Sequence, residues 1–245
     1  MDNGLSRKRV LVTGGSRGIG RAITLAFARD GAHVVACHRE PSEEAAGLTR
    51  ELKELSDRNR VVQADLTTSA GAQRLAGATQ ETLGGLDVLV NNVGVDGMVP
   101  FDRLGEDEWR RVMEHNVTTA YLVTHASLGL LTDGASIVNV GASVALRGRP
   151  GGVHYTASKA ALIGLTRGLC KDLGSRGIRV NLVAPGLTET EPDAGLPPQL
   201  VERMVGMTAL GRLCQPDDVA GAVLFLAGEN SRYVTGTTLT VDGGV

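Results

Sequence analysis

The stretch that most constrains the fold is residues 10–20, which read V-L-V-T-G-G-S-R-G-I-G. Its first three residues form an apolar, valine-rich run of the kind found in strands buried on both faces. The residues that follow it, 21–28, have apolar positions at helical spacing. Strand, glycine turn and helix in this order form a phosphate-binding unit, because glycine lets the backbone approach a ligand and a helix N-terminus offers free N–H groups. The alternative is a surface turn that binds nothing. The glycines of this turn are Gly14, Gly18 and Gly20.

Composition and charge narrow the class of protein. The chain has 245 residues, 42% of them hydrophobic, and a formal net charge of -2, which fits one globular domain and gives no sign of a nucleic-acid or membrane partner. No apolar run is long enough to span a bilayer, and the polar first eight residues lack the apolar centre of a signal peptide. We therefore expect a cytoplasmic protein. Its cysteines, Cys37, Cys170 and Cys214, are odd in number and far apart, which favours reduced thiols over disulfides or a metal site.

The end of the second expected strand, residues 33–37, bears on cofactor choice. In dinucleotide-binding folds the residue that closes this strand meets the adenosine ribose, and an acidic residue there selects NAD. This chain has His38 and Arg39 at that place and Arg17 in the glycine turn. Two arginines near one ribose favour a 2′-phosphate, and hence NADP. The alternative is that Arg39 only ends the strand and lies in water.

Further strands and helices alternate along the rest of the chain. The third expected strand, 61–66, carries Asp65, which could accept a hydrogen bond from the adenine amine, cap the following helix, or do both. The fourth, 86–90, is followed by N-N-V-G, in which the asparagines can pin neighbouring backbone and Gly94 lets a cofactor come close. The alternation predicts a single-domain, doubly wound, seven-stranded parallel sheet with helices on both faces. The remaining expected strands are 136–140, 178–184 and 238–242, and the helices are 42–55, 69–83, 106–126, 154–165 and 217–227.

Four polar residues later in the chain are candidates for chemistry. Asn116 lies among apolar residues in an expected helix, where the plainer interpretation is a structural asparagine that kinks the helix and binds a water. Ser143 follows the strand 136–140. Tyr155 and Lys159 are four residues apart, so both project from one helix face; alone, the pair would be a surface contact. Together with Ser143 they can converge where the ends of parallel strands face a bound cofactor. Residues 187–213, rich in proline, glycine and acidic side chains, predict a substrate lid.

The motifs T-G-G-S-R-G-I-G, N-N-V-G, Asn116, Ser143, Y-T-A-S-K and P-G-L-T-E-T occur in this order along essentially the whole chain. The set resembles the short-chain dehydrogenase/reductase family. Within it, the chain looks most like the 3-oxoacyl-(acyl-carrier-protein) reductases and polyketide ketoreductases, and its ending T-G-T-T-L-T-V-D-G-G also matches that group. The resemblance implies a Rossmann fold and an NADPH-dependent ketoreductase that converts the ketone of a 3-oxoacyl thioester or polyketide intermediate to a secondary alcohol.

The resemblance also implies a role for each candidate. Tyr155 is expected to donate a proton to the substrate oxygen, with Lys159 lowering its pKa and holding the nicotinamide ribose. Ser143 is expected to donate a hydrogen bond to the same oxygen, and Asn116 to hold a water that links Lys159 to solvent. No metal is expected. The implied cofactor contacts are Gly14, Ser16, Arg17, Gly18, Ile19, Gly20, Arg39, Asp65, Leu66, Asn92, Gly94, Tyr155, Lys159, Pro185, Gly186, Thr188 and Thr190.

The chain departs from that family at several places. Ala142 stands where many relatives carry a second serine. The turn before strand 136–140, residues 131–135, is short and acidic where carrier-protein reductases commonly have a basic one, so an acidic carrier protein finds less positive charge there. Arg147 and Arg176 are the candidates to compensate, whereas acidic side chains in the lid add to the difference. These lid residues are Glu189, Glu191 and Asp193.

Other functions therefore stay open. A free or aromatic ketone is the next substrate class, followed by an alcohol dehydrogenase that oxidises a sugar, steroid or small alcohol. A nucleotide-sensing regulator without turnover is a different class, against which the intact Asn116, Ser143, Tyr155 and Lys159 speak. The resemblance further implies a homotetramer formed by helices 106–126 and 155–173 with a C-terminal contact.

Overall fold

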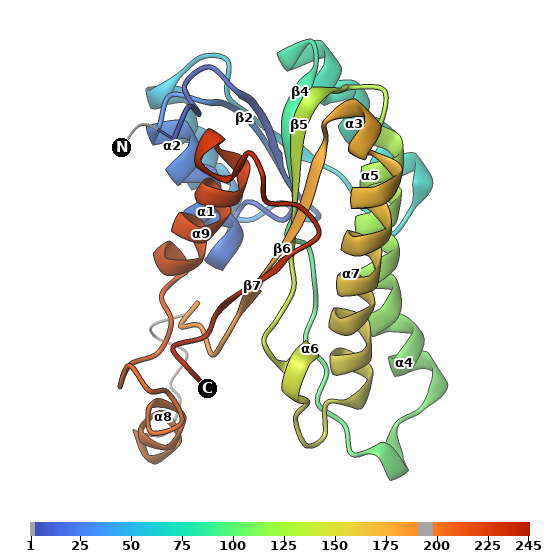
Figure 1. Ribbon diagram of the computed structural model, residues 1–245, viewed down its shortest axis with the longest axis vertical. Coiled ribbons are helices and arrows are strands. Elements are labelled where there is room, and N and C mark those ends of the chain that lie inside the picture. Colours follow the sequence, from blue (N-terminus) through green and yellow to red (C-terminus); the bar gives the residue numbers. More distant parts are fainter. Residues whose placement is uncertain (1–2, 191–197) are drawn as a thin grey trace.

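The computed structural model describes residues 3–190 and 198–245. These residues form a seven-stranded sheet in the order β3-β2-β1-β4-β5-β6-β7, in which every neighbouring pair is parallel (Figure 1). The order reverses between β1 and β4, which is the place where ligands bind in doubly wound sheets. The predicted fold class is confirmed. The strands are β1 Arg9–Val12, β2 His33–His38, β3 Arg60–Gln63, β4 Leu86–Asn91, β5 Leu131–Val140, β6 Arg179–Pro185 and β7 Thr238–Val241.

Helices cover both faces of the sheet. In Figure 1, α1, α2 and α9 lie on one side of the strands, and α3, α5 and α7 lie on the other. Among the described residues, no helix is long and apolar enough to cross a membrane. The α-helices are α1 Gly18–Arg29, α2 Glu43–Leu55, α3 Ser69–Leu83, α4 Glu106–Met113, α5 Thr119–Ser127, α6 Val144–Arg147, α7 Val153–Asp172, α8 Pro198–Val205 and α9 Pro216–Ala227.

The pleat of the central strands fills both layers of the core. In β1, Val10 and Val12 pack with the helices on the α1 side, whereas Leu11 packs with those on the α3 side. All three side chains are fully buried. A strand covered on both faces needs apolar residues at successive positions, which is why the strand signal in the sequence is a continuous apolar run rather than an alternation.

The expected helix 106–126 is interrupted. It consists of α4 and α5 joined by a π-helical turn, Glu114–Thr118, and Asn116 lies inside that turn. π-Helical turns often mark functional sites because they displace one residue from the regular helix. The interruption agrees with the kink that a polar residue in an apolar helix indicates.

Two expectations, one about the start of α3 and one about the start of β5, are wrong. Asp65 does not cap α3: the cap is Thr68, whose hydroxyl accepts from the backbone N–H of Gly71 at 3.0 Å. Residues 131–135 are not a turn before β5 but its first half, because Leu131 is buried and pairs with Leu86 of β4. The register between β4 and β5 shifts after this pair, so a glycine- and aspartate-containing stretch fits inside the strand.

The segment predicted as a lid, 187–213, is described except for residues 191–197, so Glu191 and Asp193 lie outside the described residues. Its two ends meet: the N–H of Cys214 donates to the carbonyl of Leu187, and the N–H of Glu189 donates to the carbonyl of Cys214, both at 2.9 Å. The N–H of Leu210 also donates to Gly243 near the C-terminus. The part between these anchors contains α8, which agrees with a partly helical segment.

Candidate active site

The glycine turn between β1 and α1 has a backbone that other residues do not readily adopt. Gly14 and Gly18 have φ of +62° and +52°, in the left-handed region. A Cβ at Gly20 would lie 2.1 Å from the carbonyl oxygen of Gly14, so only glycine fits there. The side-chain amide of Asn92 donates to the carbonyls of Thr13 and Gly14 at 3.0 and 3.1 Å, which fixes the turn from the end of β4. The turn therefore presents the N-terminus of α1 as a preformed cradle that fits a pyrophosphate.

The first asparagine of N-N-V-G has another role. The amide of Asn91 donates to Asn139 of β5 and to Thr124 of α5, both at 2.9 Å, and the amide of Asn139 donates to Thr166 of α7 at 2.8 Å. All of these side chains are buried. The network joins two strands to α5 and to α7, the helix that carries Tyr155 and Lys159, and so fixes α7 against the sheet.

The side chain of Asn116 is fully buried and paired. Its Oδ1 accepts from the N–H of Val95 at 2.7 Å, and its Nδ2 donates to the carbonyl of Val95 at 3.0 Å and to Ser158 Oγ at 2.8 Å. Gly94 lies beside it: a Cβ there would be 2.9 Å from both Asn116 Oδ1 and Lys159 Nζ. Asn116 thus holds the segment after β4 against α7 and lies next to Lys159, and both side chains approach Gly94 closely because it has no Cβ.

Ser143 lies just beyond the carboxyl end of β5. Its N–H donates to the carbonyl of Pro185 at the end of β6, at 2.7 Å. Its side chain is 2% exposed, and its Oγ has no hydrogen-bond partner in the structure. Burying an unpaired hydroxyl costs about 1–3 kcal/mol. Such a group is accounted for by a ligand oxygen or nitrogen that completes it.

Tyr155 and Lys159 lie on one face of α7, as their spacing predicts. Lys159 Nζ is 5.8 Å from the centre of the Tyr155 ring and donates to the carbonyl of Val140 at 3.2 Å. Burial lowers the pKa of Lys159 to about 8. The ammonium is therefore less firmly protonated than that of a surface lysine.

The pKa of Tyr155 is raised in this structure and not lowered as the neighbouring Lys159 led us to expect. Burial and, to a smaller extent, the charge of Asp96 raise the pKa of Tyr155 to about 12, against the opposing charge of Arg149. Burial outweighs the charge of Arg149 because the phenolate loses more hydration than this cation restores. At neutral pH the phenol consequently carries its proton, the form that a proton donor requires.

A hollow at the carboxyl ends of β1, β2 and β3 contains most of the residues expected near the adenosine. Asp65 accepts from the hydroxyl and N–H of Thr67 at 2.8 and 3.1 Å, and these bonds lower its pKa. His115, which sequence reasoning did not single out, also lines the hollow; its place directly before Asn116 was the available signal. The lining residues are Gly14, Cys37, His38, Arg39, Ala64, Asp65, Leu66, Thr67, Val93, His115 and Thr119.

The remaining predicted contacts lie in two neighbouring segments. Ser16 and Arg17 precede α1 in the glycine turn, and Ile19 is partly buried against the core. Pro185 ends β6, and the hydroxyl of Thr188 donates to the carbonyl of Gly186 at 3.2 Å. A Cβ at Gly18 would lie 3.3 Å from Thr190, so the segment after β6 reaches the glycine turn. Among the described residues, no group of His, Cys, Asp and Glu side chains is suited to hold a metal ion.

Comparison with known proteins agrees with this geometry. The profile of the family described as Enoyl-(Acyl carrier protein) reductase matches residues 14–245. A 3-oxoacyl-(acyl-carrier-protein) reductase of Chlamydia muridarum is 37% identical over 253 residues, covering 100% of both chains. A 3alpha-hydroxysteroid dehydrogenase of Mediterraneibacter gnavus is 35% identical, covering 98% of this chain and 97% of the relative. The chain belongs to the short-chain dehydrogenase/reductase family.

Solved structures extend the likeness to a nucleotide-bound relative. A short-chain dehydrogenase of Burkholderia cenocepacia in complex with NADP is 39% identical, has a TM-score of 0.91, and covers 98% of each chain. As a member of the short-chain dehydrogenase/reductase family, the protein is an oxidoreductase that acts on CH–OH groups. The cradle at the glycine turn fits the nicotinamide nucleotides that this family uses.

Proposed function

We propose that the protein is an NADPH-dependent ketoreductase that reduces a 3-oxoacyl thioester or polyketide ketone to a secondary alcohol. The observation that carries the proposal is the buried, unpartnered hydroxyl of Ser143 at the carboxyl edge of the sheet. A donor in such a place suits an oxygen on which negative charge develops, as it does on a carbonyl during reduction.

The chain's own residues account for the proton. When bound, a reduced nicotinamide supplies a hydride to the carbonyl carbon. Tyr155, protonated at neutral pH, donates its proton to the carbonyl oxygen, while Ser143 donates a hydrogen bond to the same atom. The ammonium of Lys159 stabilises the phenolate left behind and contacts the ribose. Asn116, beside Lys159 at Gly94, holds a water through which the proton is replaced.

The preference for NADP rests on charge at the adenosine end. Arg39 directly follows β2 and has an exposed guanidinium that pairs with the neighbouring Glu40 at 3.0 Å. The residues at the end of this strand, His38 and Arg39, are not acidic and so cannot accept from both ribose hydroxyls. With Arg17 in the glycine turn, the site offers two positive charges to a 2′-phosphate. The relative solved with NADP supports this preference.

A free ketone or alcohol is the second candidate substrate, and one ion pair favours it. Arg176, a candidate to compensate for the acidic stretch 131–135, donates to Asp133 at 3.1 Å and to the carbonyls of Leu128 and Leu131. It is therefore committed to its own fold and adds little positive charge for an acidic carrier protein. The likeness to a 3alpha-hydroxysteroid dehydrogenase points the same way.

We also propose a single domain whose segment 187–213 covers the substrate, and a homotetramer formed through α4–α5 and α7. Trp109 and Tyr121, both exposed on α4–α5, supply an apolar surface for that interface. Sedimentation tests the assembly: a monomeric mass at micromolar concentration contradicts it.

Turnover decides between the substrates. NADPH and NADH oxidation are measured with a 3-oxoacyl carrier protein, the same acyl group on N-acetylcysteamine, and a 3-oxosteroid. The proposal predicts the highest kcat/KM for NADPH with the carrier-bound acyl group. If the substrate is instead a free ketone, the highest kcat/KM is expected with the steroid or another free ketone. Tyr155→Phe should abolish turnover but keep NADPH binding, and Tyr233→Phe, at a fully exposed position, is the matched control. NADPH binding without reduction of any ketone would support the regulator instead.

A further inference from the structure

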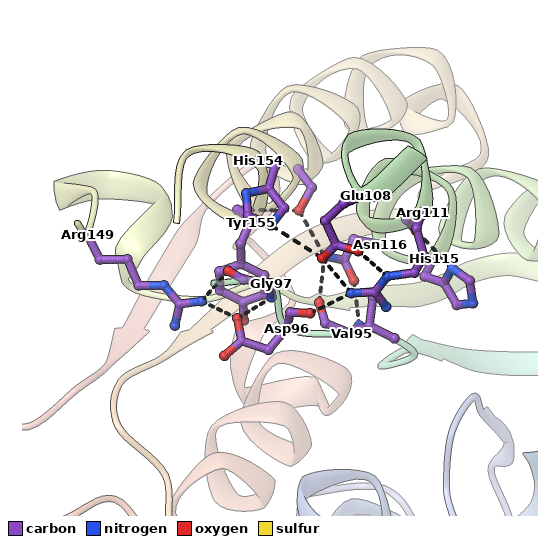
Figure 2. Close-up of polar contacts among 11 residues, drawn as sticks. Val95, Asp96, Gly97, Glu108, Arg111, His115, Asn116, Arg149, His154 and Tyr155 are labelled. Atoms are coloured by element: carbon purple, nitrogen blue, oxygen red, sulfur yellow. Dashed lines mark hydrogen bonds and ion pairs between the residues drawn. The ribbon is translucent and has the colours of Figure 1, made fainter. Parts of the chain in front are cut away.

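An ion pair lies over the ring of the candidate proton donor. Arg149, in the loop between α6 and α7, places its guanidinium carbon 4.6 Å from the centre of the Tyr155 ring. The same guanidinium is bound to the carboxylate of Asp96, in the segment after β4, and donates to the carbonyl of Gly97 at 2.9 Å. Figure 2 shows the guanidinium reaching from its own loop to Tyr155 and Asp96. The pair thus joins two loops that are far apart in the sequence, and its guanidinium packs on the ring of Tyr155.

The pair is held more firmly than an ordinary surface ion pair. The Arg149 side chain is 25% exposed, with its Nε buried, whereas the Asp96 side chain is 66% exposed and is held by further hydrogen bonds. Asp96 accepts from the N–H of Gly97 at 2.7 Å, and its carbonyl accepts from Arg111 at 3.1 Å. A backbone bond from Val99 to Gly151, at 2.7 Å, ties the same two loops. A guanidinium with fixed acceptors and little freedom keeps its position over the ring.

We infer that Arg149 is a positioning residue of this site: held by Asp96 and the carbonyl of Gly97, it fixes the ring of Tyr155 and places a second positive charge beside it. A cation over an aromatic face is attracted to the ring, and the attraction grows when the ring becomes an anion. Asp96 holds the guanidinium of Arg149 in place, and its negative charge partly cancels the effect of that guanidinium on Tyr155. Arg149 has this role only if Tyr155 donates the proton, so it rests on the proposed function.

The charged groups around Tyr155 set the expected directions. Lys159 lies on the same helix, Arg149 precedes the helix, and Asp96 comes from the segment after β4. The adjacent His154 is fully buried, with its Nε2 3.6 Å from the carboxylate of Glu108 on α4. Arg149 lowers the pKa of Tyr155 and Asp96 raises it. Removal of the cation should make the phenol a weaker acid, and removal of the anion should make it a stronger one.

This opposition separates the assigned role from a merely structural ion pair. Breaking a structural pair from either side has the same kind of effect, whereas Arg149→Met and Asp96→Asn should here act in opposite directions. With a ketone substrate and NADPH, Arg149→Met is expected to lower kcat about ten-fold with a smaller change in KM, and Arg149→Lys to restore part of the loss. Asp96→Asn is expected to raise kcat. The matched control is the exposed ion pair of Arg60 and Glu81. Arg60→Met and Glu81→Gln should change neither kcat nor KM.

The phenol can also be titrated without turnover. The chain has three tyrosines, so Tyr121→Phe with Tyr233→Phe leaves Tyr155 as the only one. Tyrosinate absorbance after a rapid pH jump, read before the protein unfolds, should appear at lower pH in Asp96→Asn and at higher pH in Arg149→Met than in the parent. Shifts in the same direction, or unchanged kcat and titration in Arg149→Met, overturn the role of Arg149. Failure of the proposed function looks different: no ketone is reduced, while the titrations still separate as expected.

Discussion

Arg39, at the end of β2, lies against His115, in the π-helical turn between α4 and α5. The Nη1 of Arg39 is 3.2 Å from the Nε2 of His115. The Nδ1 of the same ring is 2.8 Å from the carbonyl of Arg111, which can only accept, so Nδ1 carries the proton and Nε2 accepts from the arginine. The adenosine end of the site is therefore linked to the turn that also holds Asn116.

This relationship predicts how Arg39 contributes to cofactor choice. Arg39→Ala should raise the KM for NADPH about 10- to 100-fold, because a hydrogen bond to a charged group contributes about 1.5–3 kcal/mol. The KM for NADH should change little, since NADH has no 2′-phosphate. Steady-state kinetics with both nucleotides measure the ratio of the KM for NADPH to the KM for NADH. The control is Arg60→Ala, at the start of β3.

His115→Ala tests the link itself. It should raise the KM for NADPH only about 2- to 10-fold, because it removes a single hydrogen bond that orients Arg39. If His115→Ala costs as much as Arg39→Ala, the histidine contacts the nucleotide directly. If both leave the nucleotide preference intact, the 2′-phosphate binds elsewhere.

Ser143→Ala should separate stability from activity. The variant removes a buried hydroxyl that has no partner, so the free energy of unfolding should stay equal or rise by about 1 kcal/mol. Loss of a donor at the developing oxyanion should lower kcat about 100- to 1,000-fold. Urea unfolding and turnover are measured on the same preparation. A clear loss of stability would mean that the hydroxyl has a partner within the fold.

Lys159→Met should make the protein more stable and inactive. Lys159 has a pKa of about 8 in the fold against its usual 10.5, so between these values the folded chain holds fewer protons than the unfolded one. Charging this buried amine opposes folding below pH 8, and the opposition is relieved as pH rises toward 10.5; the gap corresponds to roughly 3 kcal/mol. At pH 7 the variant should therefore gain about 1–3 kcal/mol, less the bond to Val140. A gain that persists undiminished at pH 10 would contradict this cause.

Local sequence signals predicted the frame of the site. The apolar runs of β1 and β4 and the glycines between β1 and α1 each act through their own backbone or immediate neighbours, so they can be read without the fold. The four-residue spacing of Tyr155 and Lys159 is also local, and the structure places both on one face of α7. Asn116 signalled an irregular helix because a buried polar residue needs partners wherever it lies.

Properties that depend on tertiary contact could not be predicted. The pKa of Tyr155 follows from burial, which no short window of sequence contains. Asp96 and Arg149 are 53 positions apart and meet only because the loops after β4 and α6 end at the same edge of the sheet. Thr68 caps α3 because the helix begins at Ser69, the next residue, whereas Asp65 lies too far from this start. The exact start of a helix depends on backbone geometry that the sequence does not specify.

An ion pair at the amino ends of β1 and β4 allows us to predict how the protein loses stability in acid. Arg9, at the start of β1, donates to both carboxylate oxygens of Asp87 in β4 at 2.7 and 2.8 Å, and its own N–H donates at 2.9 Å. Thr132 adds a fourth bond at 2.9 Å. Although burial raises the pKa of Asp87, these bonds lower it more, to about 2.

A carboxylate with a lowered pKa stabilises the fold at pH values above its ordinary pKa of 3.8, and this contribution is lost as pH falls through about 2. Asp87→Asn should therefore lower the free energy of unfolding by about 1–2 kcal/mol at pH 7, and the difference from the parent should shrink between pH 4 and about 2. Urea titrations at several pH values measure this, with the exposed Glu81→Gln as control. Because Asp87 lies near the start of β4, away from Tyr155, turnover at pH 7 should be unchanged. A difference that stays constant down to pH 2 would mean that Asp87 acts through packing and not through its charge.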